Sequence, residues 1–277
     1  MSDGPPESAR QPGPYTHGYG AAVLGSHRAR TAENSAAHLL PHLRPGQRLL
    51  DVGSGAGTIT ADLARIVGPG NVTALEVAEE SAALTRAELA AQGLDEVTVV
   101  VGDAQALDLP DDAFDVVHAH QVLQHLPRPV DALREARRVT RPGGLVAVRD
   151  SDYEGFRWFP EDARLDRWLT LYLAAARANG GTPDAGRRLL AWAHEAGFTD
   201  VTPGASTWLH ATEESRAAWG ATWSGRITSD PLAGQLEHEG LADAAVREDV
   251  ARAFRDWAAH PDAWFVLLHG EILAVSP

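Results

Sequence analysis

Residues 50–58 read Leu50-Asp51-Val52-Gly53-Ser54-Gly55-Ala56-Gly57-Thr58. The apolar run at 48–52 predicts a short buried strand, and the sequence after the glycines predicts a helix over 58–67. Glycines at such a turn let the backbone adopt dihedral angles that other residues avoid, and let it approach a ligand closely. The free N–H groups at the start of the helix favour a carboxylate. A plain tight turn between a strand and a helix is the alternative interpretation.

Strands and helices alternate over the following hundred or so residues. Further strands are predicted at 71–77, 96–101, 114–118 and 145–148, and helices at 79–92 and 129–139. This alternation predicts an α/β fold whose parallel sheet is covered on both faces. The right-handed crossover rule makes the sheet doubly wound. Ligands bind such sheets outside the carboxyl ends of the strands, so we expect the site at that edge.

The second half of the chain has a different character, because all eight tryptophans lie beyond residue 157. Aromatic residues at helical spacing usually pack in a core, which is predicted for Trp168, Trp192 and Trp257. Four others fall on predicted loop or lid segments, where one or two are expected to line a pocket: Trp158, Trp208, Trp219 and Trp223. The predicted segments are a disordered tail at 1–14, an N-terminal helical cap at 15–46, a core at 47–209, an inserted helical lid at 210–262 and a last core strand at 263–277.

Composition excludes several kinds of site and partner. The 277 residues include no cysteine, which rules out disulfides, cysteine–zinc sites and a cysteine nucleophile, and no metal site is predicted. The formal charge is −14, from 24 basic and 38 acidic residues, so nucleic acid is not an expected partner. No apolar run approaches the roughly 20 residues that span a bilayer, and the first 14 residues do not resemble a signal peptide. A cytoplasmic protein with no membrane partner is expected.

Two acidic residues follow the next two strands. Glu76 and its neighbour Val77 end the second strand, about 20 residues beyond the glycines, where a carboxylate can accept hydrogen bonds from ribose hydroxyls. Gly102-Asp103-Ala104 follows the third strand. There a carboxylate can accept the amino group of adenine, while the Ala104 backbone contacts a ring nitrogen. A solvated charge at Glu76 and an Asx-type turn at Asp103 are the alternatives.

The chain resembles class I S-adenosylmethionine-dependent methyltransferases over about residues 36–150, and it is most similar to their ubiquinone/menaquinone-biosynthesis-type group. Five motifs in the family's order carry the resemblance: Asp51-x-Gly53-x-Gly55-x-Gly57, Glu76, Gly102-Asp103-Ala104, Phe114-Asp115-Val116-Val117 and Arg141-Pro142-Gly143-Gly144. The resemblance implies S-adenosylmethionine as the cofactor. It also implies a seven-stranded sheet in the order 3-2-1-4-5-7-6, with the last strand antiparallel.

The resemblance further implies how the cofactor is bound. Its ribose is expected at Glu76 and Val77, and His120 and Gln121, after the fourth strand, are expected to flank the cofactor. The methionine end is expected at Asp51, Gly53, Ser54, Gly55, Gly57 and Thr58, and the adenine at Gly102, Asp103 and Ala104.

A second resemblance lies near the N-terminus. Tyr15-Thr16-His17-Gly18, Ser26-His27-Arg28 and the run 30–36 are similar to a subgroup common in fungal and actinobacterial specialised metabolism. That subgroup includes enzymes that methylate thiols of gliotoxin-like dithiols, and in it this segment closes over the cofactor. Tyr15 and His17 are therefore expected near the sulfonium, with simple anchoring of the tail as the alternative for Tyr15.

Candidate catalytic residues follow the fourth and fifth strands. His125 is the best candidate for a general base because an unperturbed histidine titrates near neutrality, and His120 lies beside the expected methyl group. Arg149, Asp150 and Asp152 reach the same edge, where one of them is expected to orient the substrate. Helix capping or packing for His125, and a loop or cap role for the aspartates, are the alternatives.

The predicted function is methylation of sulfur or oxygen on a small, partly aromatic or heterocyclic metabolite, with sulfur favoured by the N-terminal resemblance. C-methylation of a quinone-like ring is an alternative, although the tryptophan-rich second half departs from the quinone-type pattern. A non-catalytic S-adenosylmethionine-binding protein is a second. A nicotinamide-dependent oxidoreductase is a third, but it calls for G-x-G-x-x-G, and Thr58 stands where the last glycine would fall. The oligomeric state is open, and a homodimer is compatible with the sequence.

Overall fold

The computed structural model describes residues 30–229 and 231–277. The predicted tail and most of the predicted cap, with Tyr15 and His17, lie outside these residues. In the described part of the cap, helical structure is limited to α2 (Ala32–Ser35) and the 3-10 turn η1 (Leu40–His42), shorter than the predicted helix. Pro41 lies within η1. A proline ring clashes with the carbonyl group four residues earlier and has no N–H to donate, which accounts for the interruption.

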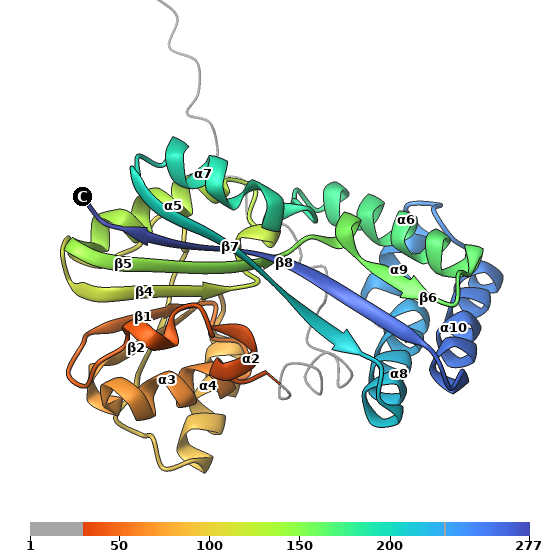
Figure 1. Ribbon diagram of the computed structural model, residues 1–277, viewed down its shortest axis with the longest axis horizontal. Coiled ribbons are helices and arrows are strands. Elements are labelled where there is room, and N and C mark those ends of the chain that lie inside the picture. Colours follow the sequence, from red (N-terminus) through yellow and green to blue (C-terminus); the bar gives the residue numbers. More distant parts are fainter. Residues whose placement is uncertain (1–29, 230) are drawn as a thin grey trace, which may run out of the picture.

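One eight-stranded sheet runs through the molecule (Figure 1). Its strands are β1 (Leu49–Val52), β2 (Val72–Glu76), β3 (Thr98–Val101), β4 (Phe114–His120), β5 (Thr140–Ser151), β6 (Arg157–Phe159), β7 (Asp200–His210) and β8 (Trp264–Val275). The order is β3-β2-β1-β4-β5-β8, with β7 on the far side of β8. Strands β1 to β5 are parallel, whereas β8 is antiparallel to β5 and β7. The predicted order is thereby confirmed, and the short β6 is an addition that pairs with the outer part of β8.

Helices cover both faces of the parallel part of the sheet, as Figure 1 shows. On one face lie α3 (Thr58–Val67), which the 3-10 turn η2 (Pro69–Asn71) joins to β2, and α4 (Glu79–Ala91), which follows β2. On the other lie α5 (Pro129–Val139), η5 (Ala185–Arg188) and α7 (Leu189–Glu195). Each face has its own apolar core, one around Leu49, Leu63 and Val116 and the other around Val117 and Leu133.

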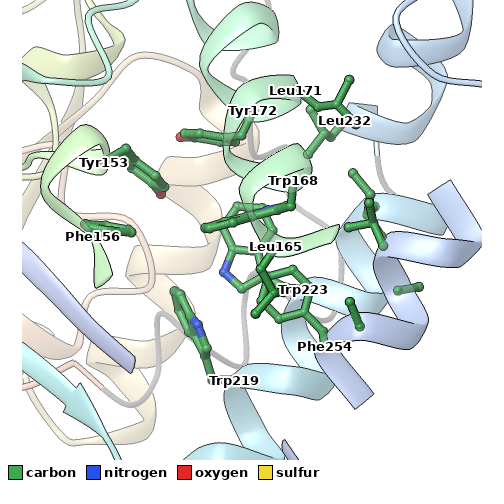
Figure 2. Close-up of a cluster of buried hydrophobic side chains, with 14 of the residues drawn as sticks. Tyr153, Phe156, Leu165, Trp168, Leu171, Tyr172, Trp219, Trp223, Leu232 and Phe254 are labelled. Carbon is green, nitrogen blue, oxygen red and sulfur yellow. The ribbon is translucent and has the colours of Figure 1, made fainter. Parts of the chain in front are cut away.

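A helical region packs at the outer end of β7 and β8 (Figure 1). It consists of α6 (Ala163–Ala178), α8 (Glu213–Ser229), α9 (Pro231–His238) and α10 (Ala244–Ala259). Figure 2 shows its aromatic core, in which Trp168, Trp223 and Phe254 are fully buried. Trp219 belongs to the same core, so Trp219 and Trp223 pack inside the helical region, as Trp168 and Trp257 do. None of the helices in the described part combines the length and apolarity that a bilayer crossing requires.

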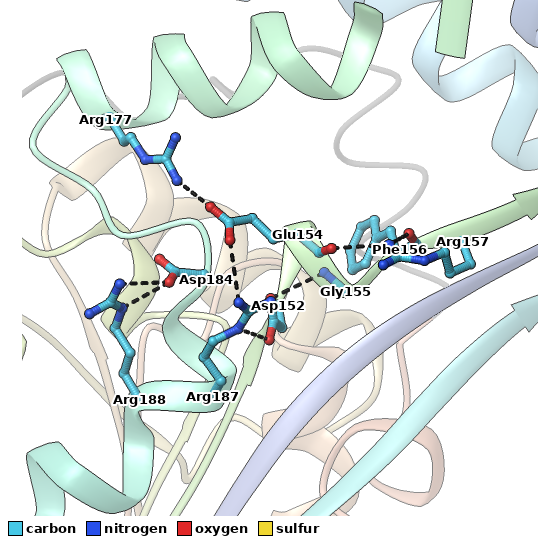
Figure 3. Close-up of polar contacts among 9 residues, drawn as sticks. All are labelled: Asp152, Glu154, Gly155, Phe156, Arg157, Arg177, Asp184, Arg187 and Arg188. Atoms are coloured by element: carbon cyan, nitrogen blue, oxygen red, sulfur yellow. Dashed lines mark hydrogen bonds and ion pairs between the residues drawn. The ribbon is translucent and has the colours of Figure 1, made fainter. Parts of the chain in front are cut away.

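Ion pairs connect the loop after β5 to the segments that pack on it (Figure 3). The buried Asp152 carboxylate accepts from Nε and Nη2 of Arg187, at 2.6 and 2.7 Å. Around it, Arg188 pairs with Asp184, and Glu154 of the 3-10 turn η4 (Tyr153–Gly155) pairs with Arg177 of α6. Both Asp152 oxygens are bonded to Arg187. Asp152 therefore fixes the loop after β5, in which it lies.

The closest backbone contact in this region predicts a sharp effect on stability. A methyl group at Gly270 of β8 would lie 1.9 Å from the carbonyl oxygen of Gly186 in η5. Gly270→Ala should therefore lower the free energy of unfolding by about 1–3 kcal/mol through overpacking, measured by urea denaturation. Gly234→Ala is the matched control, because nothing lies within 4 Å of its added methyl group. It should be neutral or stabilise α9 by up to about 1 kcal/mol. Equal effects of the two substitutions would contradict the contact.

Candidate functional site

The glycine turn after β1 depends on glycine for both conformation and space. Gly53, Gly55 and Gly57 all have positive φ, at 70°, 56° and 82°. A Cβ at Gly53 would lie 2.5 Å from Cγ2 of Val122, and one at Gly57 would lie 3.3 Å from the carbonyl oxygen of Thr85. The turn is therefore bare backbone at the start of α3, a cradle in which Gly53 and Gly57 pack against Val122 and Thr85 of the protein itself. Such a cradle fits a ligand that must approach the backbone closely.

Asp51 lies beneath this turn and is buried. Its Oδ2 accepts from Thr60 Oγ1 at 2.5 Å, and its Oδ1 lies 2.7 Å from Nδ1 of His118 on β4. Both oxygens are thus engaged inside the protein, where they connect β1, α3 and β4. The expected contact of Asp51 with the methionine end of the cofactor stays a prediction.

Glu76 lies directly beside the turn at the carboxyl end of β2. Its carboxylate accepts from the backbone N–H of Gly55, and Ser54 Oγ lies 3.4 Å away. Burial raises the pKa of Glu76, and the hydrogen bond from Gly55 opposes that rise. The next residue, Val77, is 54% exposed and leaves an apolar surface beside the carboxylate.

The third expected segment is adjacent to the second. The N–H of Gly102 donates to the carbonyl oxygen of Glu76 at 2.9 Å, so the ends of β2 and β3 are held together. Asp103 Oδ1 accepts from the backbone N–H and Nε2 of Gln105, at 2.8 and 3.1 Å. This is the Asx-type turn foreseen as the alternative. A contact with adenine is compatible with it, because Oδ2 takes part in neither bond, and the half-buried Ala104 lies alongside.

Gln121 turns the chain sharply after β4. It has a φ of 54°, which is rare for a residue other than glycine and often marks a functional position. Its Oε1 accepts from Arg30 at 2.9 Å, and its Nε2 lies 2.9 Å from Nε2 of His269 on β8. Sequence reasoning placed Gln121 at the site and included Arg30, 91 positions away, in the N-terminal segment expected to close over the cofactor, but it missed His269, 148 positions away.

His120 ends β4 in a buried aromatic environment. Its ring centroid lies 5.6 Å from that of Trp208 on β7 and 6.4 Å from that of His269. Burial holds the pKa of His120 well below its usual range, and the charges of Arg30 and Arg149 lower it further. The imidazole is therefore neutral at physiological pH. Trp208, one of the four tryptophans expected near a pocket, is the one that lies beside His120.

The two other predicted catalytic residues have different surroundings. His125 lies in the 3-10 turn η3 (Leu123–His125), and its pKa is lowered to about 3 by burial and by the charges of Arg30 and Arg226. Asp150 is fully buried, with Oδ2 and Oδ1 accepting from the backbone N–H groups of Leu123 and Gln124 at 3.3 and 3.2 Å. Burial raises the pKa of Asp150 to about 7, against the effect of these bonds. Consecutive strand residues face opposite sides of a sheet, so Asp150 faces away from its neighbour Arg149.

Comparison with known proteins identifies the family. The family described as "Methyltransferase domain" matches residues 50–148, from β1 into β5. An uncharacterized methyltransferase of Schizosaccharomyces pombe is 32% identical over 269 residues, which cover 94% of this chain and 95% of that protein. The chain belongs to the class I S-adenosylmethionine-dependent methyltransferases. S-adenosylmethionine is accordingly the cofactor of this methyltransferase, and the glycine cradle with Glu76 beside it fits that group.

Other relatives extend the comparison. A probable methyltransferase of Aspergillus luteorubrus, ltbC, is 29% identical and covers 96% of this methyltransferase and 99% of its own length. A ubiquinone/menaquinone biosynthesis C-methyltransferase of Ruegeria is 39% identical over only 133 residues, half of its own length. Among solved structures, a methyltransferase from Bacillus halodurans shares the fold with a TM-score of 0.54 at 20% identity, over 87% of this chain and 98% of its own.

The position of Glu76 predicts a loss of cofactor affinity when its charge is removed. Glu76→Gln keeps the shape of the side chain but weakens acceptance from ribose hydroxyls. We expect S-adenosylhomocysteine to bind about 10–100-fold more weakly, measured by titration calorimetry. Glu80→Gln, on the exposed first turn of α4, is the matched control and should bind normally. Unchanged affinity in Glu76→Gln would show that this carboxylate does not hold the ribose.

Proposed function

We propose that this methyltransferase acts on a sulfur or oxygen atom of a small, partly aromatic specialised metabolite, with sulfur favoured. One observation carries the proposal: the histidines at the expected methyl-transfer edge are neutral and weakly basic. Burial lowers the pKa of His120, His125 and His269, and arginine charges lower all three further. A site of this kind suits an acceptor that ionises with little help from a base.

The chemistry follows from these charges. S-adenosylmethionine supplies a methyl group that is already activated on a sulfonium, so the protein mainly aligns the acceptor and excludes water. Alignment of this kind can contribute roughly 7–11 kcal/mol to lowering a barrier. A thiol with a pKa of about 8.5 is partly ionised near neutrality, whereas a phenol near 10 needs more assistance. Positive charge at Arg149 and Arg30 lowers the acceptor's pKa and so favours its reactive anion.

The three predicted catalytic residues take distinct parts in this proposal. His120 contacts the acceptor and, being neutral, tolerates the nearby sulfonium without charge repulsion. His125 has its Nε2 3.1 Å from Nε2 of Gln124, and its low pKa makes it a weak base. Asp150 acts as a positioning residue, because its carboxylate fixes the backbone of Leu123 and Gln124 after β4.

The alternative of C-methylation on a quinone-like ring finds less support. The relative named for that reaction matches 47% of this chain. Removing a proton from a ring carbon or its phenol also calls for a stronger base than a histidine whose pKa is about 3. The acidic composition, with a formal charge of −14, supports a small-molecule acceptor over nucleic acid. We propose a cytoplasmic enzyme in specialised metabolism.

The pH dependence of the reaction tests the proposal. With an alkyl thiol as acceptor, kcat/KM should rise with pH until the thiol ionises near its pKa of about 8.5. No inflection that depends on His120 or His125 is expected near the usual histidine value of about 6.5, because both rings stay neutral on either side of it. Titration of Asp150, whose pKa is raised to about 7, gives an inflection that persists in His125→Gln. His125→Gln should lower kcat/KM less than about tenfold, whereas loss of a true general base costs about 10²–10⁴-fold.

The exposed His194→Gln on α7 is the control for this series. An inflection between pH 6 and 7 that disappears in His125→Gln would identify His125 as the general base after all. Failure of the protein to methylate any thiol or phenol in a panel of such acceptors would count against the proposed substrate class.

A further inference from the structure

A row of polar residues crosses the sheet where β4 ends. The strand register aligns His120 of β4 with Arg149 of β5, Glu271 of β8 and Gly204 of β7. Residues paired in this way present their side chains to the same face of a sheet. His269 of β8 lies two positions from Glu271 and therefore shares that face. Arg149 is 1% exposed and lies at the centre of this row.

The guanidinium of Arg149 is bonded on one side only. Its Nε donates to Ser206 Oγ at 2.9 Å and to Glu271 Oε1 at 3.1 Å. Its Cζ lies 4.8 Å from the centre of the Trp208 ring. Within residues 30–229 and 231–277, Nη1 and Nη2 are buried and find no acceptor. Buried N–H groups of a charged side chain are costly to leave unbonded, so these two nitrogens call for a ligand that supplies oxygen acceptors.

The surroundings of Arg149 favour a negatively charged ligand. Both ring nitrogens of His120 are also buried without a partner among the described residues. Ser206 and Glu271 engage only Nε of Arg149, and the positive charge of Arg149 lowers the pKa of His120 and of His269. The same charge that disfavours a second cation attracts an anion. Two parallel N–H donors on one guanidinium match the planar geometry of a carboxylate.

The location of the row connects it to the transfer site. His269 lies 2.9 Å from Gln121, the residue that turns the chain after β4, and His120 ends that strand. We propose that Arg149, through Nη1 and Nη2, binds a carboxylate group of the methyl acceptor. This inference rests on the proposed function and names the substrate class more narrowly, as an organic acid that carries the reacting thiol or hydroxyl. His120 and His269 then donate ring N–H groups to the oxygens of the same carboxylate.

The test compares a carboxylate with its neutral amide. Protein saturated with S-adenosylhomocysteine is titrated by calorimetry with 4-mercaptobenzoate and with 4-mercaptobenzamide, and benzoate and 2-naphthoate cover smaller and larger acids. We expect the carboxylate to bind at least about tenfold more tightly than the amide. In the double variant Arg149→Met with Glu271→Gln, which leaves no unpaired buried charge, this preference should fall below about threefold.

Further variants keep the test decisive if the double variant does not fold. Arg149→Lys keeps the charge but presents one nitrogen, and it should retain a reduced preference for the acid. Arg167→Met, exposed on α6, is the matched control and should keep the full preference. The affinity for S-adenosylhomocysteine should stay within about twofold in every variant.

Several results would contradict the proposed binding of a carboxylate by Arg149. The inference is overturned by equal binding of acid and amide, by no binding of any carboxylate at millimolar concentration, or by a preference that survives in the double variant. Tighter binding of inorganic phosphate than of the carboxylates also overturns it. A loss of S-adenosylhomocysteine affinity of more than about tenfold would assign Arg149 to the cofactor's own carboxylate instead. Methylation of neutral thiols without any preference for acids removes this inference alone, whereas failure to bind S-adenosylhomocysteine removes the proposed function as well.

Discussion

The close packing of the glycine turn on its neighbours is the constraint on which the site depends. Gly53 has a positive φ and a methyl group there would meet Val122, which belongs to the turn after β4. The N–H of Gly53 also donates to the carbonyl oxygen of Leu75 on β2 at 2.8 Å. The turn thus touches the ends of two other strands at once. A displacement of this turn would move Glu76 and the residues after β4 together, so the expected cofactor side and the expected acceptor side of the site share one mechanical support.

The charges of the site differ from those of the whole protein. The chain carries a formal charge of −14, yet arginines dominate the electrostatics around His120 and His125. The acidic surface as a whole does not attract anions, whereas the arginines around His120 and His125 favour them at this one site. A buried charge there is screened far less than an exposed one. The histidines stay neutral there, because burial and the arginine charges lower their pKa values. Under the proposed function, the enzyme selects its acceptor by the electrostatic field and the shape of the site more than by proton transfer.

Much of the fold and the grouping of the expected cofactor residues at one edge of the sheet could be predicted because their signals are local. The glycine turn, Glu76 and Asp103 each follow a predicted strand directly, and the parallel arrangement brings the three together. The acceptor half could not be predicted in the same way. His269 and Glu271 lie in an apolar strand run, and only the register of β8 against β5 places them beside Gln121 and Arg149. Helical spacing likewise could not tell that Trp219 and Trp223 face the aromatic core.

The placement of β8 has a consequence for assembly during synthesis. This strand is made after β5 and β7, yet it lies between them and pairs with both. Until β8 inserts, β5 and β7 each have an open edge of unpaired backbone groups, which invites association with other chains. The parallel strands β1 to β5 can meet earlier, as the chain emerges from the ribosome. The nascent protein therefore gains its parallel half first, while the half that carries His269 and Glu271 stays incomplete and most exposed to aggregation.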